Sequence, residues 1–255
     1  MTLLRRHAAA FGRADRYDAH AHVQRRVAEW LADAIRPLAA GARVLEIGCG
    51  TGLLRAQPGL AADDWLMTDI APAMVARAAA RFDAVAGVRF ACLDAERPRF
   101  DPPEPPFDLI VGSLVVQWFD DLAAGLAALG ALLAPGGRIA VTTLTAGTFA
   151  EWDAAHAAEG VRSGTRTYPD MAALAAMAPA GMTARITTRL FRERHDDARG
   201  FLSGVKAIGA GTPRAGHQPI GPTALRRVMR RFEANGGGVT YAVALIDIQA
   251  TEDSE

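Results

Sequence analysis

The feature that most constrains this chain is an apolar segment that enters a glycine-rich turn. Residues 44–47 are apolar except for Glu46, and Gly48, Gly50 and Gly52 follow at alternate positions. Glycine adopts a positive φ readily, and it lets the backbone approach a ligand without an intervening Cβ. A buried strand that runs into such a turn is typical of α/β sheets that bind a nucleoside at the carboxyl ends of their strands.

The spacing of this turn separates it from a dinucleotide-binding turn. Its pattern is G-x-G-x-G, whereas dinucleotide sites carry G-x-G-x-x-G. Glu46 would repel a pyrophosphate, but it suits a ligand with positive charge. S-adenosylmethionine (SAM) carries an ammonium and a sulfonium, so the turn predicts a SAM site that includes Glu46 and the three glycines. Cys49 lies within the turn, and we interpret it as a small filler because no activating base is evident beside it.

Two further acidic residues end predicted strands. Asp69 closes the strand over 65–69 and lies 21 residues after Gly48, the spacing at which a carboxylate meets a ribose diol. Two adjacent hydroxyls can donate to one carboxylate, which explains why an acidic residue is needed there. Asp94 follows the next strand, where it is placed to accept from the adenine amino group. The neighbouring positions assigned to the same site are Ile70, Ala95 and Ser113.

The order of predicted elements indicates an α/β fold. Strands are expected over 43–48, 65–69, 88–93, 107–113, 138–144, 182–191 and 239–248. Helices are expected over 23–36, after Gly52 as far as Pro58, from Ala71, and over 122–134, 149–159, 170–177, 201–208 and 223–234. The alternation predicts a Rossmann-like, doubly wound sheet that is mostly parallel, with an antiparallel last strand and helical lid and cap insertions.

We interpret the chain as a single domain over residues 1–255. Within it, residues 1–40 are expected to form an N-terminal helical lid and residues 41–145 the ligand-binding core. Residues 146–255 complete the sheet, with cap insertions near 146–168 and 196–236.

Composition narrows the classes of partner. The chain has 28 basic and 28 acidic residues, a balance that argues against a general nucleic-acid or membrane-surface binder. Residues 1–10 contain no apolar segment of the kind found in signal peptides, and the apolar stretch over 122–134 is too short to span a bilayer. Two cysteines without metal-ligand spacing predict reduced thiols, no metal site and a cytoplasmic location.

These motifs together resemble a known superfamily. With Pro135-Gly136-Gly137, residues 40–145 resemble the class I SAM-dependent methyltransferases. A wider resemblance, over about residues 8–248, is to the malonyl-acyl carrier protein O-methyltransferases of biotin synthesis. It rests on Phe11-Gly12-Arg13-Ala14, Tyr17, Gln24, Leu114-Val115-Val116-Gln117-Trp118, Thr142-Thr143-Leu144 and Lys206-Ala207-Ile208-Gly209-Ala210. Asp15 and residues 211–214 depart from that pattern; the first bears on the lid and the second on carrier-protein contacts.

The resemblance implies methyl transfer from SAM to the free carboxylate of malonyl-acyl carrier protein, with S-adenosyl-L-homocysteine as the second product. The methyl ester masks the charge, so that fatty-acid synthesis can extend the group towards a pimeloyl thioester. An acceptor carboxylate is already ionised at neutral pH, so no general base is required. The site then has to orient the acceptor oxygen and exclude water.

Four residues are candidates for holding the acceptor: Tyr17, Gln117, Trp118 and Lys206. Gln117 and Trp118 offer an amide NH₂ and an indole N–H at the end of a strand. Tyr17 could close over the methyl donor from the lid, and Lys206, the only lysine in the chain, could meet a carboxylate or a phosphate. Each has an alternative interpretation. Trp118 could be a core aromatic, Gln117 a helix cap and Tyr17 an ordinary, partly buried tyrosine. Lys206 could instead contact the carrier protein.

A basic face on the cap is the expected docking surface for an acidic carrier protein. Its arginines are Arg192, Arg194, Arg199, Arg226, Arg227, Arg230 and Arg231. A solvated helix face is the competing interpretation.

Two other functions also remain open: methylation of another small carboxylate or a quinone-like acceptor, and a SAM-binding scaffold without turnover.

Overall fold

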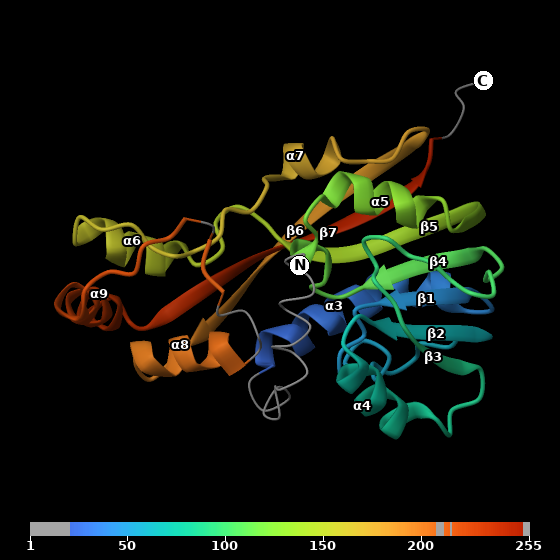
Figure 1. Ribbon diagram of the computed structural model, residues 1–255, viewed down its shortest axis with the longest axis horizontal. Coiled ribbons are helices and arrows are strands. Elements are labelled where there is room, and N and C mark those ends of the chain that lie inside the picture. Colours follow the sequence, from blue (N-terminus) through green and yellow to red (C-terminus); the bar gives the residue numbers. More distant parts are fainter. Residues whose placement is uncertain (1–20, 208–211, 215, 252–255) are drawn as a thin grey trace.

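The computed structural model describes residues 21–207, 212–214 and 216–251 (Figure 1). Its helices are α3 (His22–Ala39), α4 (Pro72–Phe82), α5 (Leu122–Gly130), α6 (Ala150–Ala158), α7 (Met171–Ala175), α8 (Ala198–Ala207) and α9 (Pro222–Ala234), with a 3-10 turn η1 (Val116–Trp118). Its strands are β1 (Arg43–Ile47), β2 (Asp64–Asp69), β3 (Val88–Cys92), β4 (Phe107–Gly112), β5 (Leu133–Leu144), β6 (Met182–Arg194) and β7 (Gly238–Ala250).

The seven strands form one sheet in the order β3-β2-β1-β4-β5-β7-β6. Strands β1 to β5 pair in parallel, and β7 runs antiparallel to both β5 and β6. This confirms the predicted α/β class and its antiparallel last strand. The chain order reverses between β1 and β4, and such a switch point opens a crevice at the carboxyl ends of the two strands.

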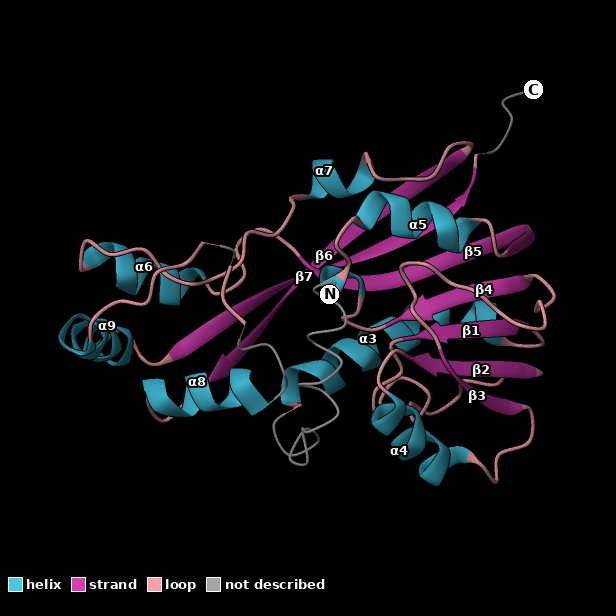
Figure 2. Ribbon diagram, in the orientation of Figure 1, coloured by secondary structure: helices cyan, strands magenta, loops and turns pink. Residues whose placement is uncertain are grey.

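Helices cover both faces of the sheet (Figure 2). The helix expected from the four-residue spacing of apolar residues is present as α3. Val27, Leu31 and Ile35 lie on one stripe of this helix and are fully buried. Phe82 of α4 lies in the same apolar cluster, whereas Leu126 of α5 and the Leu174 side chain of α7 belong to a second cluster on the opposite face. Two covered faces explain why β1 and β4 read as nearly continuous apolar runs.

Strands β6 and β7 extend beyond the rest of the sheet and carry α6, α8 and α9 at their far end (Figure 1). The three helices enclose an aromatic cluster. Trp152 of α6 contacts Phe201 of α8 and Phe232 of α9, with ring centroids 5.4 Å apart in both pairs. Aromatic pairs at this distance add to the stability gained from burial. Helices α6, α8 and α9 therefore pack on one another through their aromatic side chains.

Two elements differ from the sequence prediction. The short helix expected directly after Gly52 is absent: residues 50–56 form successive turns instead. The segment is short, and Gly59 reverses it with φ +76°. Helix α5 ends at Gly130 rather than at residue 134, since β5 already pairs with β4 at Leu133. A bulge in that pairing absorbs Pro135-Gly136-Gly137.

Within residues 21–207, 212–214 and 216–251, every helix is too short or too polar to cross a bilayer.

Candidate active site

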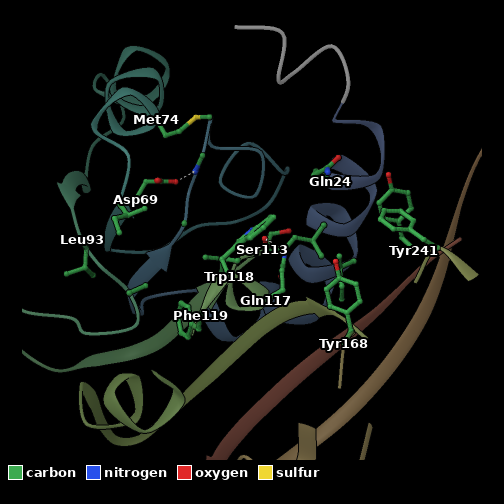
Figure 3. Close-up of a pocket in the computed structure, with 18 residues that line it drawn as sticks. Gln24, Asp69, Met74, Leu93, Ser113, Gln117, Trp118, Phe119, Tyr168 and Tyr241 are labelled. Atoms are coloured by element: carbon green, nitrogen blue, oxygen red, sulfur yellow. Dashed lines mark hydrogen bonds between the residues drawn. The ribbon is translucent and has the colours of Figure 1, made fainter. Parts of the chain in front are cut away.

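A cavity of about 120 Å³ lies at the carboxyl ends of β1 and β4, at the switch point of the sheet. Figure 3 shows its two sides. Asp69, Met74 and Leu93 lie on one side, Tyr168 and Tyr241 on the other, and Trp118 between them. The wall is mostly apolar with a few polar groups, as is usual for sites that bind small molecules.

The three glycines of the turn serve different purposes. All have positive φ, at +60° for Gly48, +53° for Gly50 and +80° for Gly52. A Cβ on Gly48 would lie 2.3 Å from Val115 Cγ2, and one on Gly52 would lie 2.3 Å from Phe82 Cε2. Both glycines therefore serve packing as well as turn geometry. Gly50 has open space where its Cβ would be and lines the cavity, so its backbone is the part that a ligand can approach.

Glu46 is buried behind the turn. Its Oε2 accepts a 2.8 Å hydrogen bond from Trp65 Nε1, and its side chain is only 2% exposed. Burial raises its pKa to about 8, with the Trp65 bond acting in the opposite direction. A small cavity of about 30 Å³, which shares Gly48, Gly50 and Ser113 with the first, reaches this carboxyl group. It has room for a group the size of an ammonium.

Asp69 lies at the end of β2 with its carboxylate in the first cavity (Figure 3). Its two oxygens accept from the backbone N–H of Gly50, at 3.0 Å, and of Ala71, at 2.8 Å. Burial raises its pKa, and these two bonds partly offset the effect. The carboxylate is thus fixed between two backbone donors, and its remaining lone pairs are available to the cavity.

The other positions assigned to the cofactor fall into two groups. Ile70, Ala95 and Ser113 line the first cavity, as do Gly48 and Gly50, whereas Glu46 and Cys49 line the small cavity behind it. Gly52 and Asp94 line neither; Leu93 and Ala95 reach the first cavity on either side of Asp94. Burial raises the pKa of the Cys49 thiol far above its usual value, which fits the interpretation of this residue as a filler.

Gln117 lines the first cavity, but its amide has the opposite orientation from the one expected. Its Nε2 donates to the Leu114 carbonyl at 2.6 Å, while its Oε1 is buried without a hydrogen-bond partner. The free atom is an acceptor, and an acceptor does not bind a carboxylate. The expectation that the Gln117 amide NH₂ holds the acceptor oxygen is therefore not supported by this geometry.

A second cavity, of about 590 Å³, adjoins the first and shares Trp118, Phe149 and Tyr168 with it. It extends from the sheet into the cap and includes Lys206 of α8, whose side chain is exposed. Trp118 thus lies where the two cavities meet. Tyr17, the remaining candidate, lies outside the described residues.

Sequence reasoning missed three side chains at this junction. Tyr168 and Tyr241 both line the first cavity, and burial raises the pKa of each phenol. Arg166 lines the second cavity, with its guanidinium carbon 5.4 Å from the Trp118 ring centroid. Tyr168 and Arg166 come from the segment between α6 and α7, where no periodicity exists to place a side chain. Tyr241 lies on β7, where the apolar character of the predicted strand offered a signal.

The predicted basic face of α9 is divided by an ion-pair cluster. Glu159 accepts from Arg227 at 2.9 Å and from Arg231 at 2.8 Å, which links α9 to the end of α6. Arg226 and Arg230 on the same helix are exposed and carry no ion pair among the described residues. Glu159 therefore balances one of the two positive charges of Arg227 and Arg231.

The chain is similar to methyltransferases in sequence and in structure. Residues 45–139 match a family described as a methyltransferase domain. The N-methyltransferase NodS from Bradyrhizobium japonicum WM9, solved with S-adenosyl-L-homocysteine, superposes with a TM-score of 0.58 at 14% identity and covers 99% of this chain and 100% of that one. A SAM-dependent methyltransferase from Mesorhizobium loti superposes with a TM-score of 0.52 at 19% identity, covering 87% and 97%. Similarity at this level shows the fold.

Relatives in sequence are more specific. The biotin biosynthesis bifunctional protein BioCD of Bordetella avium is 44% identical over 91% of this chain, which spans about half (49%) of that relative. The malonyl-[acyl-carrier protein] O-methyltransferase of Magnetococcus marinus is 37% identical, over 91% of this chain and 88% of that protein. The chain belongs to the family of malonyl-[acyl-carrier protein] O-methyltransferases.

Proposed function

We propose that the protein transfers a methyl group from SAM to the free carboxylate of a malonyl thioester carried by acyl carrier protein, in the biotin pathway. One observation supports this most directly: the cavity that contains Asp69, with Glu46 lining the small cavity behind it, adjoins a larger cavity whose charged lining residues are basic. Among the described residues that line the second cavity, none is acidic, while Arg166 and Lys206 are basic. A cationic donor and an anionic acceptor therefore fit on opposite sides of Trp118.

On the donor side, Glu46 faces the ammonium and Asp69 the ribose hydroxyls. The unpaired Gln117 Oε1 accepts a donor group of the bound ligand, since an unsatisfied buried acceptor is costly. When bound, SAM supplies an electrophilic methyl group, so that an acceptor oxygen forms the O–C bond while the sulfur retains the electron pair. The assignment of each residue to a part of the cofactor is part of the proposal.

On the acceptor side, the chain positions the reactants and excludes water. Trp118, Phe149 and Tyr168 form the shared wall of both cavities, and two of these side chains have no ionisable group. Opposite charges that neutralise each other react faster in surroundings of low polarity than in water. The raised pKa of Tyr168 keeps its phenol neutral, so it can donate a hydrogen bond to the acceptor but does not act as a base.

Methyl transfer is tested directly with labelled SAM. We expect label to appear on malonyl-acyl carrier protein and to be released by mild base, as an ester is. Expression of the chain is expected to restore growth of a biotin-requiring strain that lacks this activity. Label on free small acids alone would favour the alternative carboxylate methyltransferase, and SAM binding without transfer to any of these acceptors would favour a scaffold.

For the carrier protein, we propose Arg226 and Arg230 as the docking residues on α9, because they are exposed and Leu225 beside them lines the second cavity. We expect the double variant Arg226→Glu/Arg230→Glu to raise KM for malonyl-acyl carrier protein about tenfold. Its KM for SAM and for malonyl-N-acetylcysteamine, which lacks the protein, is expected to stay unchanged.

The control is the double variant Arg97→Glu/Arg99→Glu, which reverses two exposed charges in the loop before β4. It is expected to behave as the wild type. Equal increases in both double variants would show a general charge effect and contradict docking on α9. Arg192, Arg194 and Arg199 are exposed as well and remain part of the proposed surface.

We also propose a cytoplasmic location. Cys49 and Cys92 are free thiols, and Cys92 is exposed. Exposed thiols persist in reducing compartments, where disulfides are rare.

A further inference from the structure

The second cavity contains a cation, Arg166, whose hydrogen-bonding groups are not all satisfied within the described part of the chain. The Nη1 atom of Arg166 is buried and has no hydrogen-bond partner. No carboxylate among the described residues lies within ion-pair distance of its guanidinium. Asp153 lines a neighbouring cavity with Arg166, but its Oδ1 accepts a 2.5 Å hydrogen bond from Ser163 Oγ. A buried guanidinium nitrogen without a partner is costly, and a bound anion would satisfy it.

The position of Arg166 matches the point where transfer must occur. Its guanidinium carbon lies 5.4 Å from the centre of the Trp118 ring, and Trp118 belongs to both cavities. Its charge also acts on the phenol of Tyr168, which is a second shared wall residue and whose pKa it lowers against the stronger effect of burial. An anion on Arg166 would therefore lie next to the opening that leads to the methyl donor.

The segment that carries Arg166 is fixed on both sides. Before it, the Gly164 carbonyl accepts from the Arg214 backbone N–H at 2.9 Å. After it, the Pro169 carbonyl accepts from Thr145 Oγ1 at 2.6 Å. A side chain on such a backbone is held ready for its ligand, and this lowers the entropy lost on binding.

Resting on the proposed function, we propose that Arg166 binds the free carboxylate of the malonyl group and directs it to the methyl donor. The planar guanidinium can donate two parallel hydrogen bonds to one carboxylate, a geometry that a lysine ammonium cannot provide. Lys206 is exposed at the end of α8, and it suits a more distal part of the acceptor.

This assignment has a consequence for turnover. Methylation converts the carboxylate into a neutral ester, so the ion pair with Arg166 is lost at the moment of product formation. Arg166 then favours the substrate over the product, which promotes release of the ester. It also selects malonyl thioesters over acetyl thioesters, which lack the charge.

The test compares Arg166→Met, Arg166→Lys and the control Arg162→Met with the wild type. Arg162 is an exposed residue of the same segment and does not line the second cavity. Malonyl-N-acetylcysteamine is the acceptor, because it carries neither phosphate nor protein. We expect Arg166→Met to raise its KM about 100-fold and Arg166→Lys to recover part of this loss, while the Kd for SAM stays within about twofold. Arg162→Met is expected to match the wild type.

Calorimetry in the presence of S-adenosyl-L-homocysteine supplies a readout that does not depend on turnover. In the wild type, malonyl-N-acetylcysteamine is expected to bind much more tightly than its acetyl counterpart, and Arg166→Met is expected to remove this difference without weakening the acetyl ligand. A variant that retains the malonyl preference would overturn the assignment of Arg166. If the wild type itself fails to methylate any malonyl thioester, the proposed function is wrong, so the two failures are distinguishable.

Discussion

Replacing Glu46 with Gln is expected to stabilise the ligand-free protein at pH 8.5. The buried carboxyl has a pKa of about 8, against 4.5 for the free group, so the folded state binds its proton more tightly than the unfolded state does. At pH values between these two pKa values, the folded chain binds more protons than the unfolded chain, so stability falls as the pH rises. Gln keeps the acceptor for Trp65 without the charge. We expect the free energy of unfolding to increase by ~2–4 kcal/mol at pH 8.5 and to change little at pH 4.

The same substitution is expected to weaken SAM binding about 100-fold, because the ammonium loses its carboxylate partner. Pairing requires Glu46 to ionise, so binding to the wild type at pH 7 should release a proton. Calorimetry in buffers of different ionisation enthalpy measures this release, and thermal melts over pH 4–9 measure stability.

The control is Glu29→Gln, which removes an exposed carboxylate of α3. It should change neither stability nor proton release. Normal SAM binding by the Glu46→Gln protein would contradict the role given to this residue. So would a difference in unfolding free energy between variant and wild type that stays the same from pH 4 to pH 8.5.

The fold followed from the sequence where local periodicity and burial coincide. Helix α3 and the strands β1 and β4 are such cases, since their apolar patterns are set by the sheet face that they cover. The prediction failed at residues 50–57 and 131–134, where glycine and proline end regular structure without fixing what replaces it. At Leu133 the pairing with Phe107 extends β5, and a long-range contact of this kind leaves no local pattern.

The donor side of the site could be predicted further than the acceptor side. Glu46 and Asp69 lie at the ends of β1 and β2, and the glycine turn follows β1. The carboxyl ends of such parallel strands meet at one edge of the sheet. Arg166 and Tyr168 lie in an irregular segment, and their location depends on how the cap packs on β7. The pairing of Glu159 with Arg227 and Arg231 spans 68 and 72 residues, so the divided charge of α9 was visible only in the structure.

Orientation of a side chain was harder still to predict than its location. The sequence placed Gln117 at the end of β4, and the structure has it there in η1. The Leu114 carbonyl accepts from the amide NH₂, which leaves the amide Oε1 buried without a hydrogen-bond partner. A contact three residues away in the chain thus leaves Gln117 with an unpaired acceptor where the sequence predicted a free donor.

Replacing Asp69 with Asn is expected to reduce SAM affinity by at least about 100-fold. The carboxylate accepts from Gly50 and Ala71 at once, and both ribose hydroxyls are expected to donate to it. An Asn amide presents one oxygen and one NH₂. Its NH₂ would therefore point at one of the two backbone N–H groups, donor against donor, and the charge-assisted bonds to the ribose would be lost. The turn is also expected to lose ~1–3 kcal/mol of stability.

A comparison of S-adenosyl-L-homocysteine with its 2′-deoxy analogue separates the two effects. The wild type should bind the deoxy compound much more weakly, whereas the Asp69→Asn protein should bind both about equally, because its partner for the hydroxyl is already impaired. The control Asp63→Asn changes an exposed carboxyl just before β2 and should retain the wild-type ratio. If Asp69→Asn retained it too, Asp69 would act only as a support for the glycine turn, and the ribose contact would have to come from another residue of the cavity.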